Sequence, residues 1–173
     1  MCMCIYSLVK KAATFALAHL SEDAAIHAPV IENNIIPSLI GLMNSMDFSA
    51  LVTLANMCEN ESVRDKLHEN GVDRAVIKIL KDQVKGFFPE VATTALMHLS
   101  KTCEECRQEI LRSGVITSIL KLFDLEEMLL RRNALTILVN LSHASTCHAA
   151  MPSLRTKQSC SGLFLYGKVT MNS

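Results

Sequence analysis

Residues 133–142 read "NALTILVNLS", and the last six of these residues have near-copies earlier in the chain. The related hexamers "ALAHLS", "TLANMC" and "ALMHLS" begin at residues 16, 53 and 95, and "ILVNLS" begins at 137, which gives steps of 37, 42 and 42 residues. Each copy is a mostly apolar run with a His or an Asn in its fourth place. A repeat of about 40 residues predicts stacked helical units.

The segments that follow the hexamers also resemble one another. Each contains a polar link, a short amphipathic stretch, a break, and then aliphatic residues at helical spacing. The breaks are Asn34, Gly71 and Gly114. Asn and Gly are the residue types that most readily take the left-handed conformation that closes a helix. We therefore predict the same sharp corner three times, each followed by a helix buried over a broad face.

Capping residues place the helix boundaries. Thr102 and Glu105 have the form of a capping box, and Asn60 can cap the matching helix one unit earlier. Asp47 and Asp124 stand where two of the longer helices should begin. We predict no strands, and helices near 7–20, 23–33, 35–44, 48–58, 61–69, 72–82, 89–100, 103–112, 115–123 and 126–142.

Three phrases carry a resemblance to a known family: "ENGV" at 69–72, "SGVITSILKLF" at 113–123, and "NALTILVNLS". On these phrases the chain from about residue 8 to 143 resembles the armadillo repeats of the β-catenin and importin-α type, with HEAT repeats as the alternative. The resemblance implies an all-α fold, an armadillo-type α-solenoid in which three-helix repeats form a right-handed superhelix. It places this array over residues 1–143, with a partial repeat at 8–20 and repeats at about 21–58, 59–100 and 101–142.

The end of the chain does not continue the repeat. Residues 144–173 contain no acidic residue and no clear helical period, so we expect a divergent and poorly ordered tail. Solenoid arrays normally need polar terminal caps, and neither end supplies one. We therefore expect a fragment or truncated isoform of a longer armadillo repeat-containing protein, with self-association through its uncapped ends.

The recurring polar residue of the hexamers is the candidate binding feature. From the residues alone, it either faces solvent or bonds a neighbouring carbonyl group. In armadillo proteins, which this chain resembles, the third helices line a concave groove, and an Asn at this place bonds the backbone of an extended peptide. The resemblance thus implies a groove for a protein partner, formed by His19, Asn56, His98 and Asn140, with Thr94, Thr136, Asn133 and Arg132 as neighbouring contacts.

One departure from the importin-α pattern reduces the range of ligands that we expect. That pattern has a Trp four residues before the Asn, which forms slots for lysine side chains. Here the corresponding residues are Phe15, Val52, Thr94 and Thr136, and the chain contains no Trp. Recognition of a nuclear localisation signal of the usual basic kind is therefore not expected.

Composition and charge argue against several classes of function. Lys+Arg and Asp+Glu both number 17, and this balance argues against a nucleic-acid partner. No stretch has the roughly 18 apolar residues of a membrane helix, so no membrane partner is expected. The seven cysteines are odd in number and irregularly spaced, which favours reduced thiols and a cytoplasmic protein, with the nucleus also open. Cys58 lies in an apolar helical stretch and should behave as a small hydrophobic residue.

The CxxC motif at 103–106 lies at a predicted helix start, where thiolates are favoured. A redox role would need a strand beside the helix, and zinc would need two further ligands. His98 is near in sequence, and Cys147 with His148 is one unit away, but together they complete no recognisable set. We favour a structural or incidental role for the motif and expect neither a metal ion nor another cofactor.

No nucleophile motif or phosphate-binding loop is present in the sequence, so no enzymatic activity is expected. The expected function is that of a non-catalytic protein–protein interaction scaffold, which holds an extended or helical segment of a partner in the concave groove. Two alternatives stay open. One is a structural piece of a larger repeat array without a ligand of its own, and the other is a thiol or metal site at the CxxC.

Overall fold

The computed structural model describes residues 2–82 and 87–144. Within these ranges all regular elements are helices, which confirms the all-α prediction. The elements are α1 (Cys2–Leu20), η1 (Ala24–Ile26), α2 (His27–Glu32), α3 (Ile36–Asn44), α4 (Phe48–Glu59), η2 (Glu61–Val63), α5 (Arg64–Glu69), α6 (Val72–Asp82), α7 (Phe87–Thr102), α8 (Glu104–Ser113), α9 (Ile116–Lys121), η3 (Leu122–Asp124) and α10 (Met128–Ser142).

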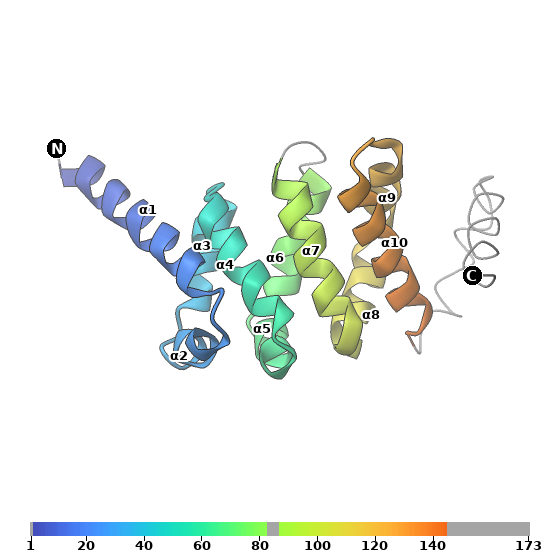
Figure 1. Ribbon diagram of the computed structural model, residues 1–173, viewed down its shortest axis with the longest axis horizontal. Helices are drawn as coiled ribbons and strands as arrows, with labels where there is room; N and C mark the ends of the chain where they lie inside the picture. Colours follow the sequence, from blue (N-terminus) through green and yellow to red (C-terminus); the bar gives the residue numbers. More distant parts are fainter. Residues whose placement is uncertain (1, 83–86, 145–173) are drawn as a thin grey trace.

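The helices are arranged in two rows (Figure 1). The longer helices α1, α4, α7 and α10 follow one another along the longest axis, each packed on the one before. Helices α3, α6 and α9 form a second row, in which α6 contacts both α3 and α9. The predicted helix boundaries agree with the observed ones to within two residues, except that α1 already begins at Cys2. Apart from Ala144, the tail predicted for 144–173 lies outside the described residues.

The three predicted corners are confirmed. Asn34, Gly71 and Gly114 have φ angles of 54°, 78° and 73°, in the left-handed region. A Cβ atom at Gly71 would meet no atom within 4 Å, so the position needs glycine for its backbone conformation and not for space. Each corner turns the chain from a short helix into the helix of the second row that follows it.

Two predicted caps are confirmed. The Asp47 side chain begins α4 by accepting hydrogen bonds from the amides of Ser49 and Ala50, at 3.0 and 3.3 Å. The Asn60 side chain accepts a hydrogen bond from the Ser62 amide at 3.1 Å, at the start of η2. Both residues satisfy donors that a helix N-terminus leaves unpaired.

The capping box predicted at Thr102 is wrong. Helix α7 continues through Thr102, and the N-cap of α8 is Cys103, whose Sγ accepts a hydrogen bond from the Cys106 amide at 3.1 Å. The Thr102 hydroxyl instead accepts a hydrogen bond from Nη1 of Arg64 at 2.7 Å. A contact from the preceding unit has therefore replaced the local cap.

The start predicted at Asp124 is also wrong. Asp124 ends η3, and α10 begins at Met128 with Glu127 as its N-cap, although the Glu127 side chain makes no capping hydrogen bond. The physical reason is that η3 extends the helical turn begun by α9, so the chain needs several more residues before it can turn into α10.

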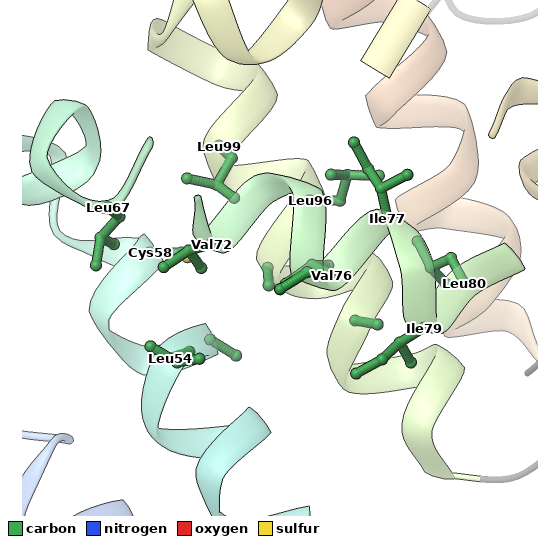
Figure 2. Close-up of a cluster of buried hydrophobic side chains, with 14 of the residues drawn as sticks. Leu54, Cys58, Leu67, Val72, Val76, Ile77, Ile79, Leu80, Leu96 and Leu99 are labelled. Atoms are coloured by element: carbon green, nitrogen blue, oxygen red, sulfur yellow. The ribbon is translucent and has the colours of Figure 1, made fainter. Parts of the chain in front are cut away.

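A continuous hydrophobic core runs between the two rows. Figure 2 shows its central part, where α4, α5, α6 and α7 meet. Leu54, Val72, Val76, Leu96 and Leu99 are among the fully buried side chains. This confirms that the aliphatic residues after the second corner form one broad buried face. Cys58 lies in the same cluster as a free buried thiol, as predicted.

Candidate functional site

The four recurring polar residues lie on four consecutive helices of one row. His19 is on α1, Asn56 on α4, His98 on α7 and Asn140 on α10. Because each of these helices packs on the one before, the four residues form a single row across the molecule. His19 is exposed, and the other three are partly buried.

Asn56 bonds the preceding helix. Its Nδ2 donates to the Ala18 carbonyl oxygen at 3.3 Å and to Oγ of Ser21 at 3.0 Å, both at the end of α1. The Ser21 hydroxyl donates to the same Ala18 oxygen at 2.7 Å, which leaves Oγ free to accept from Asn56. The amide donors of Asn56 therefore connect α4 to α1.

Asn140 repeats this arrangement one pair of helices further along. Its Nδ2 donates to the Met97 carbonyl oxygen at 3.3 Å and to Oγ of Ser100 at 2.9 Å, at the end of α7. Ser142, in the last place of its own hexamer, donates to the Val139 oxygen in the way that Ser100 donates to Met97. In these hexamers the Asn in the fourth place donates a hydrogen bond to the preceding longer helix. The Ser in the sixth place can accept a hydrogen bond from the longer helix that follows.

His98 stands at a junction where the preceding hexamer ends in Cys58 instead of Ser, and its contact is a different one. Its Nε2 lies 3.6 Å from Oε1 of Glu59. Burial is the largest influence on the imidazole and lowers the pKa of His98; Glu59 opposes this shift, while Arg64 and Lys101 add to it. The junction between α4 and α7 therefore differs from the other two, because an imidazole beside a carboxylate takes the place of an Asn that donates to a Ser hydroxyl.

His19 stands at the exposed end of the row. Its ring packs edge-on against Phe15 with centroids 4.6 Å apart, and its Nδ1 lies 3.7 Å from Oε1 of Glu22. It also lines an open pocket of about 580 Å³ at the end of α1, together with Leu20, Glu22, Asp23, Ala24 and Ile26.

The four neighbouring residues differ in accessibility. Asn133 is only 1% exposed, and its Nδ2 donates to Oγ1 of Thr94 at 2.9 Å, so it presents no surface to a ligand. Thr94 is partly exposed and donates to the Glu90 oxygen. Thr136 is partly exposed and donates to the backbone oxygen of Arg132, which is an exposed residue. Of this set, Thr94, Thr136 and Arg132 reach the surface.

Sequence reasoning missed a second recurring contact. Arg64 is 3% exposed, and its guanidinium donates to the carbonyl oxygens of Cys58 and Glu59, both at 2.8 Å. These groups end α4, where a cation is favoured by the helix dipole. The buried charge is thus satisfied by the helix end and by Thr102 of the next unit.

The equivalent residues of the other units act in the same way. Nη1 of Arg107 donates to the oxygens of Ser100 and Lys101 at 3.0 and 3.2 Å, and Nε2 of His27 lies 2.8 Å from the Ser21 oxygen. These residues follow the end of their hexamers by six or seven places. A recurring basic or imidazole donor at this offset was the signal that could have revealed them.

The CxxC motif is paired in the structure. Cys103 and Cys106 form a disulfide with their Cα atoms 5.2 Å apart, whereas the sequence predicted reduced thiols. Cys103 is the N-cap of α8 and Cys106 lies in its first turn, three residues further on, which brings the two sulfur atoms together. A ring nitrogen of His68 and the two Sγ atoms all lie within 4.8 Å of one another. His98 does not belong to this group, and Cys147 and His148 lie outside the described residues.

In the described ranges, no helix is long and apolar enough to cross a membrane. No protein-family model matches the chain, and no curated protein matches its sequence at a significant level.

Proposed function

We propose that the chain is an armadillo-type array that acts as a non-catalytic protein-binding scaffold. The observation that carries this proposal is the row of His19, Asn56, His98 and Asn140 on four helices packed in succession. A recurring polar group on successive helices suits an extended or helical segment, whose own polar groups recur along its length. The repeated order of two short helices, a left-handed corner between them and a longer helix supports the armadillo resemblance.

The residues one helical turn before the row define the ligand chemistry of the proposed face. Phe15 is exposed, and Val52, Thr94 and Thr136 are partly exposed. Arg132 adds one exposed charge. Such a face suits a partner segment with small apolar and hydroxyl side chains and without a dense cluster of either charge.

A second candidate is a structural role within a larger repeat array. The observation that favours it is that Nδ2 of Asn56 and of Asn140 already donates to the preceding helix. In that case the row holds neighbouring units together and needs no external ligand. Double-mutant cycles for Asn56 with Ser21, and for Asn140 with Ser100, test it. Each should give a coupling of about 1 kcal/mol in the free energy of unfolding, and no coupling would remove the structural role.

The binding proposal is tested with substitutions on the proposed binding face, at residues that do not take part in the hydrogen bonds between helices. Peptides would be selected from a displayed random library with the full chain, and their Kd values measured by fluorescence anisotropy. Val52→Arg and Thr136→Arg should weaken binding at least tenfold, while Thr117→Arg, at an exposed position of α9 in the other row, should not. Thermal melts would show that all three variants are folded. Failure to select any peptide, or equal affinity for all variants, would contradict the scaffold proposal.

A further inference from the structure

We propose that Cys103 and Cys106, as reduced thiols, bind a thiophilic divalent metal ion of the Zn²⁺ class together with His68. The site lies between two consecutive units, since His68 lies in the last turn of α5 and the cysteines lie at the start of α8. It is independent of the proposed binding face, which is formed by other residues.

The ligand atoms and their spacing fit this ion. Two thiolate sulfurs and one imidazole nitrogen are ligands that Zn²⁺ prefers, and all three atoms lie within 4.8 Å of one another. Cys103 is 2% exposed and Cys106 is fully buried, so the thiolates would be shielded from solvent. Oε2 of Glu105 lies 3.9 Å from Sγ of Cys103 and can supply the fourth ligand, or a water molecule can do so.

A buried carboxylate orients the histidine. Oδ2 of Asp73 lies 2.8 Å from Nδ1 of His68, so Nε2 is the nitrogen that would bind the metal. This is the carboxylate–histidine pairing that fixes the tautomer and ring orientation of metal-binding histidines. The Asp73 side chain is fully buried, and its Oδ1 has no hydrogen-bond partner among the described residues. A dication on the far side of the His68 ring would offset this buried negative charge.

The start of α8 favours thiolates. The Cys106 amide donates to Sγ of Cys103, and the positive end of the helix dipole faces the same sulfur. Cys58 is close in sequence to this region of α5 but is not part of the group. Its thiol lies in the hydrophobic core, and burial raises the pKa of Cys58 to about 12.

The disulfide and the metal site exclude each other. Two molecules of a small thiol, RSH, open the disulfide: the bond between the cysteine sulfurs breaks, each sulfur gains one electron and one proton, and RSSR forms. A divalent ion then replaces the two thiol protons, which pass to solvent. The bound ion would connect the second unit to the third, so the reduced protein should gain stability from the metal.

The test uses the full chain without an affinity tag, reduced with a phosphine and kept free of oxygen. Co²⁺ is titrated as a spectroscopic probe and then displaced with Zn²⁺. We expect an absorption band from thiolate-to-Co²⁺ charge transfer. In the wild type this band should saturate after one more equivalent of Co²⁺ than in the Cys103→Ser/Cys106→Ser variant. Zn²⁺ should also raise the Tm of the reduced wild type.

Three single variants separate this site from metal binding elsewhere on the chain. His68→Gln should abolish the tight Zn²⁺ equivalent, and Asp73→Asn should weaken it roughly 10- to 100-fold. His98→Gln is the matched control, because the side chains of His68 and His98 are 21% and 22% exposed. Circular dichroism shows whether each variant is folded. If the double variant is unfolded, the Zn²⁺ affinity of His68→Gln is the measurement that tests the proposal. The proposal would be overturned if His68→Gln bound Zn²⁺ with the same affinity as the wild type. It would also be overturned if the folded double variant bound as many tight equivalents of Zn²⁺ as the wild type.

Discussion

Cys58 illustrates how burial controls the chemistry of a single residue. Its thiol is enclosed by the core between α4, α6 and α7, and burial raises its pKa from 9.0 to about 12, although the nearby Arg64 charge acts in the opposite direction. The thiolate is the reactive form, so the folded protein holds this thiol in its inert form.

We predict that Cys58 resists iodoacetamide in the folded protein near pH 8 and reacts once the chain is unfolded. Peptide mass spectrometry after labelling measures this. The pH dependence has a definite sign. The unfolded thiol ionises near 9.0 while the folded thiol does not until about 12, so the contribution of Cys58 to stability is lost as the pH rises through this interval. Rapid labelling of Cys58 in the native protein would contradict the prediction.

His98 should affect the stability of the protein at acidic pH, whereas Cys58 affects it at alkaline pH. Its folded-state pKa is lowered from 6.5, chiefly by burial, so the unfolded chain takes up a proton before the folded chain does. Stability should therefore fall as the solution is acidified from about pH 7.5 to about pH 5. His98→Asn should reduce this loss, whereas His143→Asn, at the exposed end of α10, serves as the control. Urea unfolding of the three proteins at both pH values measures the effect, and an equal loss in all of them would speak against it.

At the scale of the helical elements, the ends of the longer helices are held by donors from the next short helix. Arg64, Arg107 and His27 all donate to carbonyl groups that a helix C-terminus leaves unpaired. Arg64 also reaches Thr102, so it connects the end of α4 to the end of α7. These contacts connect the end of each longer helix to the short helix that follows it.

We predict that Arg64→Met destabilises the protein by about 2–4 kcal/mol, because it leaves buried carbonyl groups without donors. Arg107→Met should cost less, since Arg107 is less buried and part of its guanidinium is bonded to Glu104. Arg74→Met, at an exposed position of α6, is the control and should change little. Denaturant unfolding gives the three values. A loss for Arg64→Met no larger than that for Arg74→Met would count against this role.

The helices and corners were predictable because their causes are local. Asn34, Gly71 and Gly114 follow from the conformational freedom of Asn and Gly, and Asp47 follows from the pairing needs of a helix N-terminus. The cap at Thr102 was not predictable, because Arg64 competes for its hydroxyl from 38 residues away. Local patterns cannot show which long-range partner will reach a side chain.

The same limit applies to the sites. The row of polar residues was predicted from the hexamers, but the bond from Asn56 to Ser21 depends on how α4 packs on α1. His68 was missed because no fixed spacing relates it to Cys103 and Cys106, and only the packing of two units brings the three together. The partner and the scaffold role stay predictions.

For the whole molecule, packing is successive: α4 lies between α1 and α7, whereas α1 packs on only one longer helix. In Figure 1 the first half of α1 extends away from the rest of the fold. Leu8, Val9 and Phe15 on this helix are large hydrophobic side chains that remain exposed. Where helices pack in succession, each one is stabilised chiefly by its neighbours, so an end helix with one longer neighbour is held least firmly.

We predict that amide hydrogens of α1 exchange faster with solvent than those of α4 and α7, whose buried residues belong to the central core. Hydrogen–deuterium exchange with mass spectrometry on the full chain measures this at peptide resolution. Helix α9 of the second row gives an internal comparison. Exchange of α1 as slow as that of α7 would show that the end helix is part of one cooperative unit.

The paired roles of the hexamer have a consequence for protein engineering. Ser142 and the Val139 oxygen on α10 reproduce the acceptor pair that Ser21 and Ala18 offer to Asn56. A copy of residues 22–59 grafted after α10 should therefore bring its own Asn to an acceptor pair of the same kind. Units of this chain should be usable as interchangeable modules at Ser-ended junctions.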